Sequence, residues 1–241
     1  MEPTAEQTGS LQYCAELLKA GDEDRWLTTQ FAPEAACARL SALFAFYREI
    51  ERIPHAVTEP PLGEIRLQWW REAIDEIVKD KTPRAHPVVS AMAASGLCEP
   101  GAIELLSGMI DARARLLYDE PFASLDDLTR WFDATEGALA VVAARVWESA
   151  HRASVSGAGV AYGLARHGAA LAPSLNREIK PYANHALESA RGGLADLDDE
   201  AAACLRYVSL ARRYLAADRP PSPLSKRLRL FWATAAGRLA D

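Results

Sequence analysis

Polar side chains at helical spacing mark one stretch of the sequence as a candidate site. In ARLSALFAFYREIERIPH, Tyr47, Glu51 and His55 recur every four positions, so a helix that persists that far carries them on one side. Earlier in the stretch an apolar stripe for a core is expected, which comprises Leu40, Leu43, Phe44, Tyr47 and Ile50. A stripe that begins apolar and ends polar is typical of a helix running from a core to the mouth of a cavity. A carboxylate there can hold a hard cation, but Glu51 is the only acid on that side, and Pro54 breaks the helix before His55. The alternative is an acid at a helix end that pairs with Arg48, Arg52 or His55.

Aromatic and basic side chains follow in residues 65–77, which are expected to form a second helix after a turn that contains proline. Trp69 and Trp70 are adjacent, so they cannot share one helix face. One is expected to pack in the core and the other against a neighbour or a ligand. Arg66 could reach the mouth of a cavity, and the alternative is a solvated arginine. The apolar face expected for this helix comprises Ile65, Trp69, Ala73 and Ile77.

Further charged side chains are candidates for the lining of a cavity. Asp111, Arg113 and Arg115 are expected to form a structural ion network, and the alternative is a polar cavity wall. Glu136, in DATEG, is expected to point inward from its helix. The full set of candidates for a substrate or ligand cavity is Tyr47, Arg48, Glu51, Arg66, Trp69, Asp111, Arg113 and Glu136.

The histidines and cysteines do not form ligand sets. The five histidines are scattered without HxxxH or HExxH spacing, and the four cysteines include no CxxC pair. Neither GxGxxG nor GxxxxGK[ST] occurs. No metal site, disulfide framework or nucleotide-binding loop is therefore expected, and the cysteine pattern is typical of a reducing cytoplasm.

Charge is distributed unevenly along the 241 residues. The formal net charge is −6, which gives no general reason to expect binding to nucleic acid. From residue 201 to the end, eight basic residues stand against two acidic ones, which leaves −12 for the first 200. In the last expected helix, residues 224–239, the basic residues lie near apolar ones. Its candidate membrane or partner surface comprises Lys226, Arg227, Arg229, Phe231 and Trp232. The alternative is an ordinary last helix that packs on the body.

Helical patterns succeed one another along the whole chain, and strand signals are weak. We expect an all-α, single-domain helical bundle over residues 1–241, with the basic C-terminal helix 224–239 set off by a proline-rich link. One of these helices should begin at Ser124, where Asp127 three residues later makes a near capping box, and run to about residue 148. The N-terminus reads as neither a signal nor a transit peptide, and no apolar run is long enough to cross a membrane. The expected location is cytoplasmic, with a possible peripheral contact on the inner membrane face.

The segments LSALFAFYREIE, LQWWREAI and HPVVSAM resemble the squalene/phytoene synthase family. The resemblance implies the isoprenoid synthase fold, with a central cavity where aspartates hold Mg²⁺ against the leaving diphosphate of a prenyl substrate. Where the family has its first aspartate motif, residues 51–55 read ERIPH. The approximate equivalent of the second motif, residues 159–178, has no acid before Glu178. Glu51 and His55 would thus be remnants of a degenerate site, with no catalytic residue and no bound metal or cofactor.

The segment MIDARARLLYDEPFASLDDLTRWFDATEGAL resembles a non-catalytic branch of that family, which includes the mitochondrial assembly factor of respiratory complex I. The resemblance implies a binding or assembly protein whose partner is a respiratory-chain assembly intermediate. Two alternatives stay open. One is a prenyltransferase that joins two prenyl diphosphates head to head with a degenerate Mg²⁺ site. The other is a carrier for an isoprenoid or lipid, in which arginines hold a diphosphate without metal.

Overall fold

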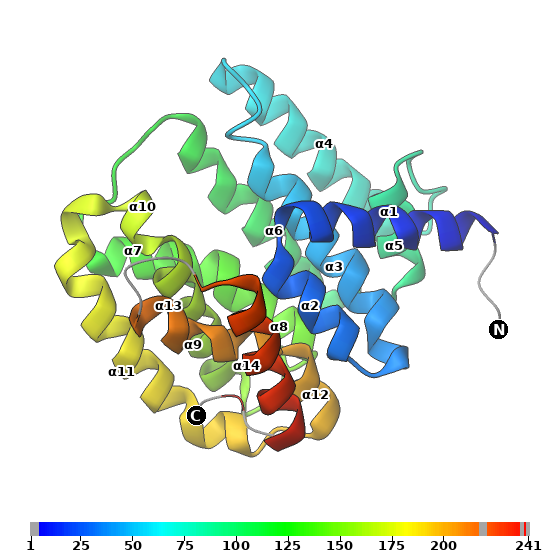
Figure 1. Cartoon of the computed structure of the whole chain (residues 1–241). Helices are drawn as coiled ribbons and strands as arrows, with labels where there is room; N and C mark the ends of the chain where they lie inside the picture. The colour runs from blue at the N-terminus through cyan, green and yellow to red at the C-terminus, as the bar shows by residue number, and fades with distance from the viewer. Residues whose placement is uncertain (1–4, 217–220, 237–238, 240–241) are drawn as a thin grey trace. The chain divides into compact units, whose positions relative to one another are not determined.

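The computed structural model describes residues 5–216, 221–236 and 239 (Figure 1). These residues form helices and connecting turns, with no β-strand among them, which confirms the expected all-α class. The chain forms two compact units, residues 1–120 and residues 121–241. The expectation that the whole chain is one domain stays a prediction.

Six α-helices and a short 3₁₀ turn make up the described part of the first unit. Prolines begin three of these helices, which suits a residue that lacks an N–H and has φ fixed near the helical value. The elements are α1 (Ala5–Gly21), α2 (Glu23–Phe31), α3 (Glu34–Arg52), α4 (Pro60–Val78), α5 (Pro87–Ala94), α6 (Pro100–Ala114) and η1 (Arg115–Leu117).

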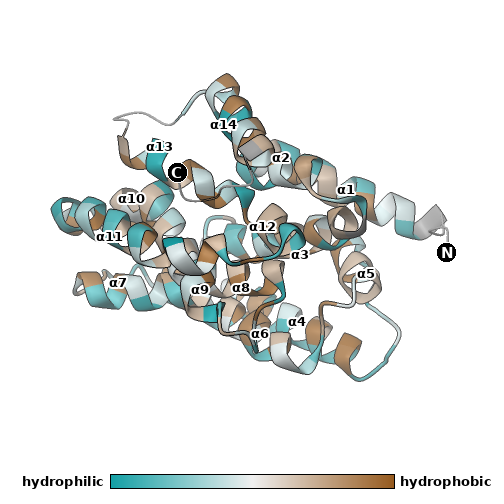
Figure 2. Cartoon of the chain, turned by 90° about the horizontal axis from the view of Figure 1, so that it is seen from below, coloured by the Kyte–Doolittle hydropathy of each residue, from teal (hydrophilic) through white to brown (hydrophobic). Residues whose placement is uncertain are grey.

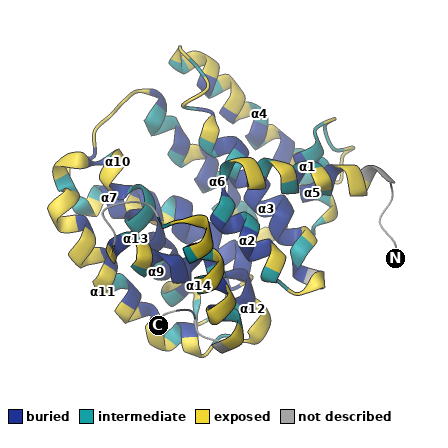
Figure 3. Cartoon of the chain, viewed as in Figure 1, coloured by how far each residue is buried: buried dark blue, intermediate teal, exposed yellow. Residues whose placement is uncertain are grey.

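Helix α3 is the centre of the first unit. It contacts α1, α2, α5 and α6, and Figure 3 colours most of it as buried. The expected core stripe is confirmed, since its members are at most 1% exposed: Leu40, Leu43, Phe44, Tyr47 and Ile50. Because α3 is surrounded on several sides, polar residues on both of its faces meet other helices. These contacts build the site described below.

Helix α4 turns a different face to the core than the sequence predicts. Its buried residues are Gly63, Leu67, Trp70, Ala73 and Ile74. Ile65 is 66% exposed, so the predicted apolar face of Ile65, Trp69, Ala73 and Ile77 is wrong. The buried residues Leu67, Trp70 and Ile74 also follow helical spacing, so the helix carries a second apolar face, and that face packs against the body of the unit. On the same face α4 comes close to η1, since a Cβ on Gly63 would lie only 2.2 Å from Leu117 Cδ2. A glycine at that position lets the backbone of α4 pack against Leu117.

The second unit contains more and shorter elements. They are α7 (Leu125–Phe132), the π-helical turn η2 (Asp133–Gly137), α8 (Ala138–Ala144), α9 (Arg152–Gly163), the π-helical turn η3 (Leu164–Gly168), α10 (Ala169–Leu171), the 3₁₀ turn η4 (Pro173–Leu175), α11 (Asn176–Ala195), α12 (Asp199–Cys204), the 3₁₀ turn η5 (Arg206–Leu210), α13 (Ala211–Ala216) and α14 (Pro223–Ala236). Helix α9 lies at their centre and contacts α7, α8, α11 and η5.

The helix predicted from Ser124 to about residue 148 begins as expected and ends early. Ser124 Oγ accepts a hydrogen bond from the Asp127 amide at 3.2 Å, which is the predicted cap. The helix then widens into η2 and stops after α8, where Arg145 adopts a left-handed conformation with φ 57°. That conformation ends an α-helix, and neither it nor the π turn has a signal in the sequence pattern.

The last helix, α14, contacts η5 and begins at Pro223. Residues 217–220 of the predicted proline-rich link lie outside the described part of the chain. Its observed bounds are Pro223–Ala236, against the predicted 224–239, and residues 237–238 of that prediction lie outside the described part. Figure 2 colours α14 in both brown and teal, so this helix carries apolar and polar residues together.

Candidate functional site

One side of α3 carries Tyr47, a residue predicted to line a cavity. Its ring is 1% exposed, and the guanidinium carbons of Arg25 and Arg113 each lie 4.7 Å from the ring centroid. Both arginines are buried as well, and Asp22 accepts an ion-paired hydrogen bond from Arg25 at 2.5 Å. Cation–π contacts of this kind strengthen where water is excluded. Tyr47 is therefore packed between buried cations inside the first unit.

Glu51 lies one turn farther along the same side of α3. Its carboxylate is 2.8 Å from Arg48 Nη1, so the predicted pairing with a neighbouring cation is present. Helix α3 ends at Arg52, and His55 lies in the following turn with an exposed side chain. The four-residue spacing from Glu51 to His55 therefore does not place the two side chains on one helix.

Asp111 and Arg113, two residues apart on α6, face different surroundings. Asp111 accepts a hydrogen bond from Arg71 Nε at 2.6 Å, and its side chain is 61% exposed. Arg113 is 3% exposed and lies against Tyr47. Asp111 thus pairs with a residue of α4, and Arg113 packs against a residue of α3.

The opposite side of α3 borders a pocket of about 340 Å³. One wall is aromatic and consists of Trp69, Trp70 and His86, with Ile53 as a further apolar neighbour. The remaining lining residues are charged: Glu49, Arg52 and Arg66. A volume of this size is within the range of sites for small ligands or for one or two side chains of a partner. Of the predicted candidates, Arg66 and Trp69 belong to this pocket.

The aromatic wall is a cluster of edge-to-face rings. Trp70 has its centroid 5.1 Å from Trp69, 5.2 Å from His86 and 5.6 Å from Phe46. Trp70 is 4% exposed and Trp69 is half-buried, so the expectation of one core and one non-core tryptophan is confirmed. The guanidinium of Arg84 covers the Trp69 ring at 5.2 Å. Edge-to-face packing fixes these ring planes, so the pocket wall is preformed.

His86 joins the pocket to the start of α5. Its Nδ1 accepts a hydrogen bond from the Val88 amide at 3.2 Å, which makes His86 the cap of that helix. Burial lowers the pKa of His86. The imidazole is therefore neutral at pH 7, and because Nδ1 is the acceptor, Nε2 carries the proton.

The charged rim is held by contacts within the first unit. Glu49, which is 5% exposed, accepts a hydrogen bond from the Tyr13 hydroxyl at 3.4 Å and pairs with Arg52 Nε at 3.2 Å. Burial, together with the charge of Glu49, raises the pKa of Tyr13, so this phenol stays protonated. Arg66 is exposed at the rim. The pocket thus offers an aromatic wall with arginines beside it, which suits an apolar side chain that has an acidic neighbour.

Arg84 supports this wall from outside. It pairs with Glu76 at 2.7 Å and with Glu72 at 2.8 Å, and its Nη1 donates to the Trp69 carbonyl at 3.3 Å. Hydrogen bonds from Arg84 lower the pKa values of both carboxyl groups. The guanidinium thereby holds Trp69 in place through its backbone and its ring together.

Glu136, in the second unit, is 1% exposed in the π-helical turn η2. Helix α9 approaches it through glycines: a Cβ on Gly163 would lie 2.6 Å from Glu136 Cγ, and one on Gly159 would lie 2.4 Å from its carbonyl oxygen. The predicted inward direction of Glu136 is present, and the residue packs against the backbone of α9.

Several residues of both sites had no clear sequence signal. Arg25 and Glu49 look like ordinary charged residues of amphipathic helices, and their burial depends on which helices surround α3. His86 is one of five scattered histidines. Its one local signal is Pro87, which marks residue 86 as the position before a helix.

In the described part of the chain, no three His, Cys, Asp or Glu side chains are placed to hold one metal ion. Within that part, no helix is long and apolar enough to cross a membrane.

The family model for squalene/phytoene synthases matches residues 18–172. Among curated proteins, "NADH dehydrogenase (ubiquinone) complex I, assembly factor 6" of Mus musculus is 28% identical over 144 residues. The Homo sapiens protein of the same name is 25% identical over 144 residues. Each match covers 54% of this chain and 39% of the relative, so the chain spans about two fifths of those proteins.

Solved structures share the fold at low sequence identity. A dehydrosqualene synthase in complex with a ligand has a TM-score of 0.76 at 13% identity, over 98% of this chain and 99% of that one. The squalene synthase HpnC from Alicyclobacillus acidocaldarius has a TM-score of 0.72 at 13% identity, over 89% and 94%. These likenesses confirm the predicted isoprenoid synthase fold.

Proposed function

The chain belongs to the squalene/phytoene synthase family, and from that premise we propose that it is a non-catalytic member that binds a protein partner during assembly of respiratory complex I. The relatives named as complex I assembly factors support the part of the proposal that places this chain in complex I assembly. The single observation that supports the proposed loss of catalysis is the ion pair between Glu51 and Arg48 at 2.8 Å.

This ion pair lies where the family resemblance expects carboxylates that hold Mg²⁺. A hard cation needs several oxygen ligands, and a carboxylate that already pairs with a guanidinium gives up that pairing to bind one. Here one acid remains on that side of α3, with arginine beside it and His55 outside the helix. The donor set of the first unit therefore does not fit the magnesium site of the family.

The binding surface we assign to this function is the pocket of Trp69, Trp70 and His86. Its wall is rigid and aromatic, which is the composition of sites that anchor a partner's side chain. Arg52 and Arg66 lie at its rim, so the partner segment should carry an apolar residue next to an acidic one. Exposed apolar residues continue along α4 from the pocket, because Leu62 is 49% exposed and Ile65 66% exposed.

The first test uses a strain that lacks the gene and carries it back as a variant. Trp69→Ala should lower the amount of assembled complex I on native gels while the protein itself stays at its normal level. The matched control is Trp26→Ala, because Trp26 is also a half-buried tryptophan of the first unit under a cation, Lys19 at 5.6 Å. If both variants lower the amount of complex I equally, or if neither lowers it, the pocket is not the binding surface.

The rim charge gives a second test. Arg66→Glu should weaken co-purification of the partner, whereas Arg66→Lys, which keeps the charge, should retain most of it. If both variants behave alike, the partner does not use an acidic residue at this rim.

Catalysis is tested directly with the purified chain. It is titrated with farnesyl diphosphate by calorimetry, with and without Mg²⁺, and the same samples are extracted for products. No binding and no product are the expected results. A new C30 product would show a prenyltransferase and overturn the proposal, and binding without product would replace it with the isoprenoid carrier.

A further inference from the structure

Helix α14 has two apolar faces. Leu230 and Ala233, at 0% and 4% exposure, face the body of the second unit, where α14 contacts η5. Leu224, Leu228 and Phe231 point the other way. A surface helix of a globular protein normally keeps its outer face polar, so the second apolar face has a use outside the unit.

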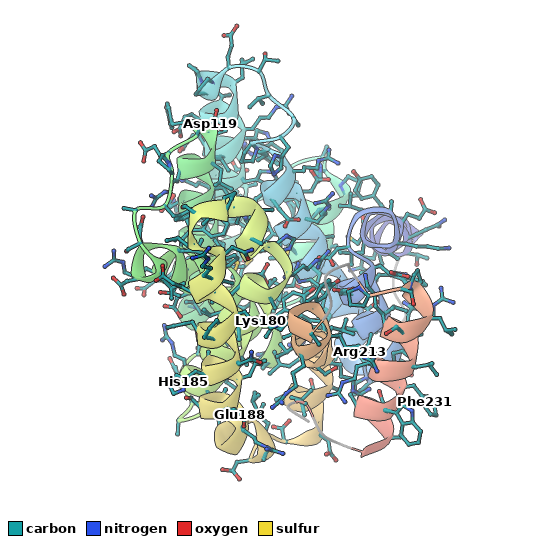
Figure 4. All side chains as sticks on the ribbon, turned by 60° about the vertical axis from the view of Figure 1, so that its left-hand side comes forward. Asp119, Lys180, His185, Glu188, Arg213 and Phe231 are labelled. Atoms are coloured by element: carbon teal, nitrogen blue, oxygen red, sulfur yellow. The ribbon has the colours of Figure 1, made fainter. Side chains whose placement is uncertain are left out.

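The outer face forms a continuous stripe. Leu224, Leu228 and Phe231 follow the helical spacing of four and three residues, and Trp232 lies beside Phe231 with 6.1 Å between ring centroids. Their exposed fractions are 68%, 50%, 54% and 62%. Of the nine large apolar side chains described as exposed, these four gather on one helix. Figure 4 shows Phe231 projecting outward from α14.

All the charges of α14 are positive. Lys226, Arg227 and Arg229 lie on it, and it contains no acidic residue. Arg227 is exposed next to the stripe. Arg229 donates to the Ser209 carbonyl at 3.2 Å, and Lys226 lies 5.8 Å from the Tyr214 ring, so both stay on the flanks of the helix. Arg213 of α13 adds an exposed positive charge nearby, at 3.0 Å from Ser225 Oγ.

We propose that this outer face of α14 binds the surface of a lipid bilayer that contains anionic lipids. The apolar stripe lies at the boundary between headgroups and acyl chains, with Phe231 and Trp232 at the depth that aromatic side chains prefer. The exposed basic side chains beside the stripe, Arg227 and Arg213, contact lipid phosphates. The proposal does not rest on the assembly function, since a catalytic member could use the same face.

Charge is the reason to assign lipid as the occupant. The chain as a whole is −6, yet this helix carries only positive residues beside its exposed stripe, which matches a uniformly negative surface. A bilayer also accepts apolar side chains from a convex helix without a preformed groove, whereas a protein partner needs one. Binding through this face leaves the rest of the unit in water.

The test is flotation of the full chain with vesicles. One set is pure phosphatidylcholine, and the other contains equal parts of phosphatidylcholine and phosphatidylglycerol. Binding to the mixed vesicles, weaker binding to the neutral ones and release by salt are expected. No binding to the mixed vesicles, or equal binding to both sets, would overturn the proposal.

Two pairs of substitutions locate the surface. Leu228→Ser with Phe231→Ser should reduce the partition coefficient roughly tenfold or more, because two large apolar side chains no longer enter the bilayer. Leu62→Ser with Ile65→Ser, on α4, is the matched control, with exposed fractions of 49% and 66%. Unchanged binding of the first pair, or equal loss in both pairs, would show that α14 is not the contact.

A charge substitution and a spectroscopic readout complete the experiment. Arg227→Glu should reduce binding to the mixed vesicles about tenfold, since each basic residue near an anionic surface contributes about fivefold and the reversal adds repulsion. Brominated lipid should quench tryptophan emission of the wild type more than that of Trp232→Phe. Equal quenching in the two proteins would contradict insertion of Trp232.

Discussion

The two sides of α3 differ in what surrounds their polar residues. On one side, Tyr47 lies between the buried guanidinium groups of Arg25 and Arg113, and Glu51 pairs with Arg48. On the other side, Glu49 and its neighbours border an open pocket with a tryptophan wall. The first side pairs its charges within the unit, and we call it the closed side of α3. The second side borders a pocket with an aromatic wall, and we call it the open side. We therefore propose that the pocket side of α3 carries the function, and Arg52 and Ile53, from the segment that replaces the family's first metal motif, are part of the pocket lining.

The largest expected loss of stability comes from removing a buried ion pair on the closed side. Arg25→Ala removes the ion partner of Asp22, whose side chain is 2% exposed, and should lower the free energy of unfolding by about 3–5 kcal/mol. Urea denaturation followed by circular dichroism measures it. The control is Arg71→Ala, which breaks a partly exposed pair with Asp111 and should change stability by less than about 1 kcal/mol. Similar losses in both variants would mean that Arg25 is not a buried structural cation.

On the open side, the two adjacent tryptophans should differ in how much they contribute to stability. Trp70→Ala should lower the free energy of unfolding by about 3–5 kcal/mol, because a buried aromatic side chain leaves a cavity. Trp69→Ala should lower it by about 1 kcal/mol, since it loses its cation–π contact with Arg84 but is only half-buried. Urea denaturation followed by circular dichroism measures both losses. If Trp69→Ala is the more damaging change, the pocket wall is part of the core.

The sequence predicted the closed side better than the open one. The stripe of Leu40, Leu43, Phe44 and Tyr47 follows from helical periodicity alone, and Arg48 is close enough in the sequence to pair with Glu51. The pocket depends on which face of α4 is buried, and on that face Gly63 lies close to Leu117. Periodicity placed Ile65 on the wrong face because α4 has two sets of apolar residues at helical spacing, and only packing decides that Leu67, Trp70 and Ile74 are buried.

Long-range partners were also beyond the sequence. The neighbours of Tyr47 come from α2 and α6, and those of Glu49 include Tyr13 from α1. Such contacts depend on how helices pack, which no local pattern records. The split between Trp69 and Trp70 was predictable, because adjacent residues on a helix must face apart.

The pH dependence of stability tests the pocket at His86. Burial lowers its pKa in the folded state below 6.5, so the unfolded chain binds a proton more readily. Stability should therefore be full above about pH 6.5 and fall as the pH drops from there toward the folded-state pKa. His86→Asn keeps a cap for α5 and should flatten this fall, as measured by urea titrations between pH 8 and pH 5. At pH 8 wild type and variant should respond alike to small pH changes. An unchanged slope in the variant would assign the fall to other groups.

The smallest expected change in stability comes from Glu51. The same variant tests whether this carboxylate binds Mg²⁺ or stays paired with Arg48. Glu51→Gln breaks a partly exposed pair with Arg48 but also removes a negative charge from the C-terminal end of α3, where the helix dipole disfavours it. These effects oppose each other, so stability should change by less than about 1 kcal/mol. Calorimetry with farnesyl diphosphate should give the same heats with and without Mg²⁺ for the variant and the wild type, and Asp111→Asn serves as the control for loss of one exposed acid. If Glu51→Gln alone abolishes a magnesium-dependent signal, then Glu51 binds the metal in spite of Arg48, and both sides of α3 are open to ligands.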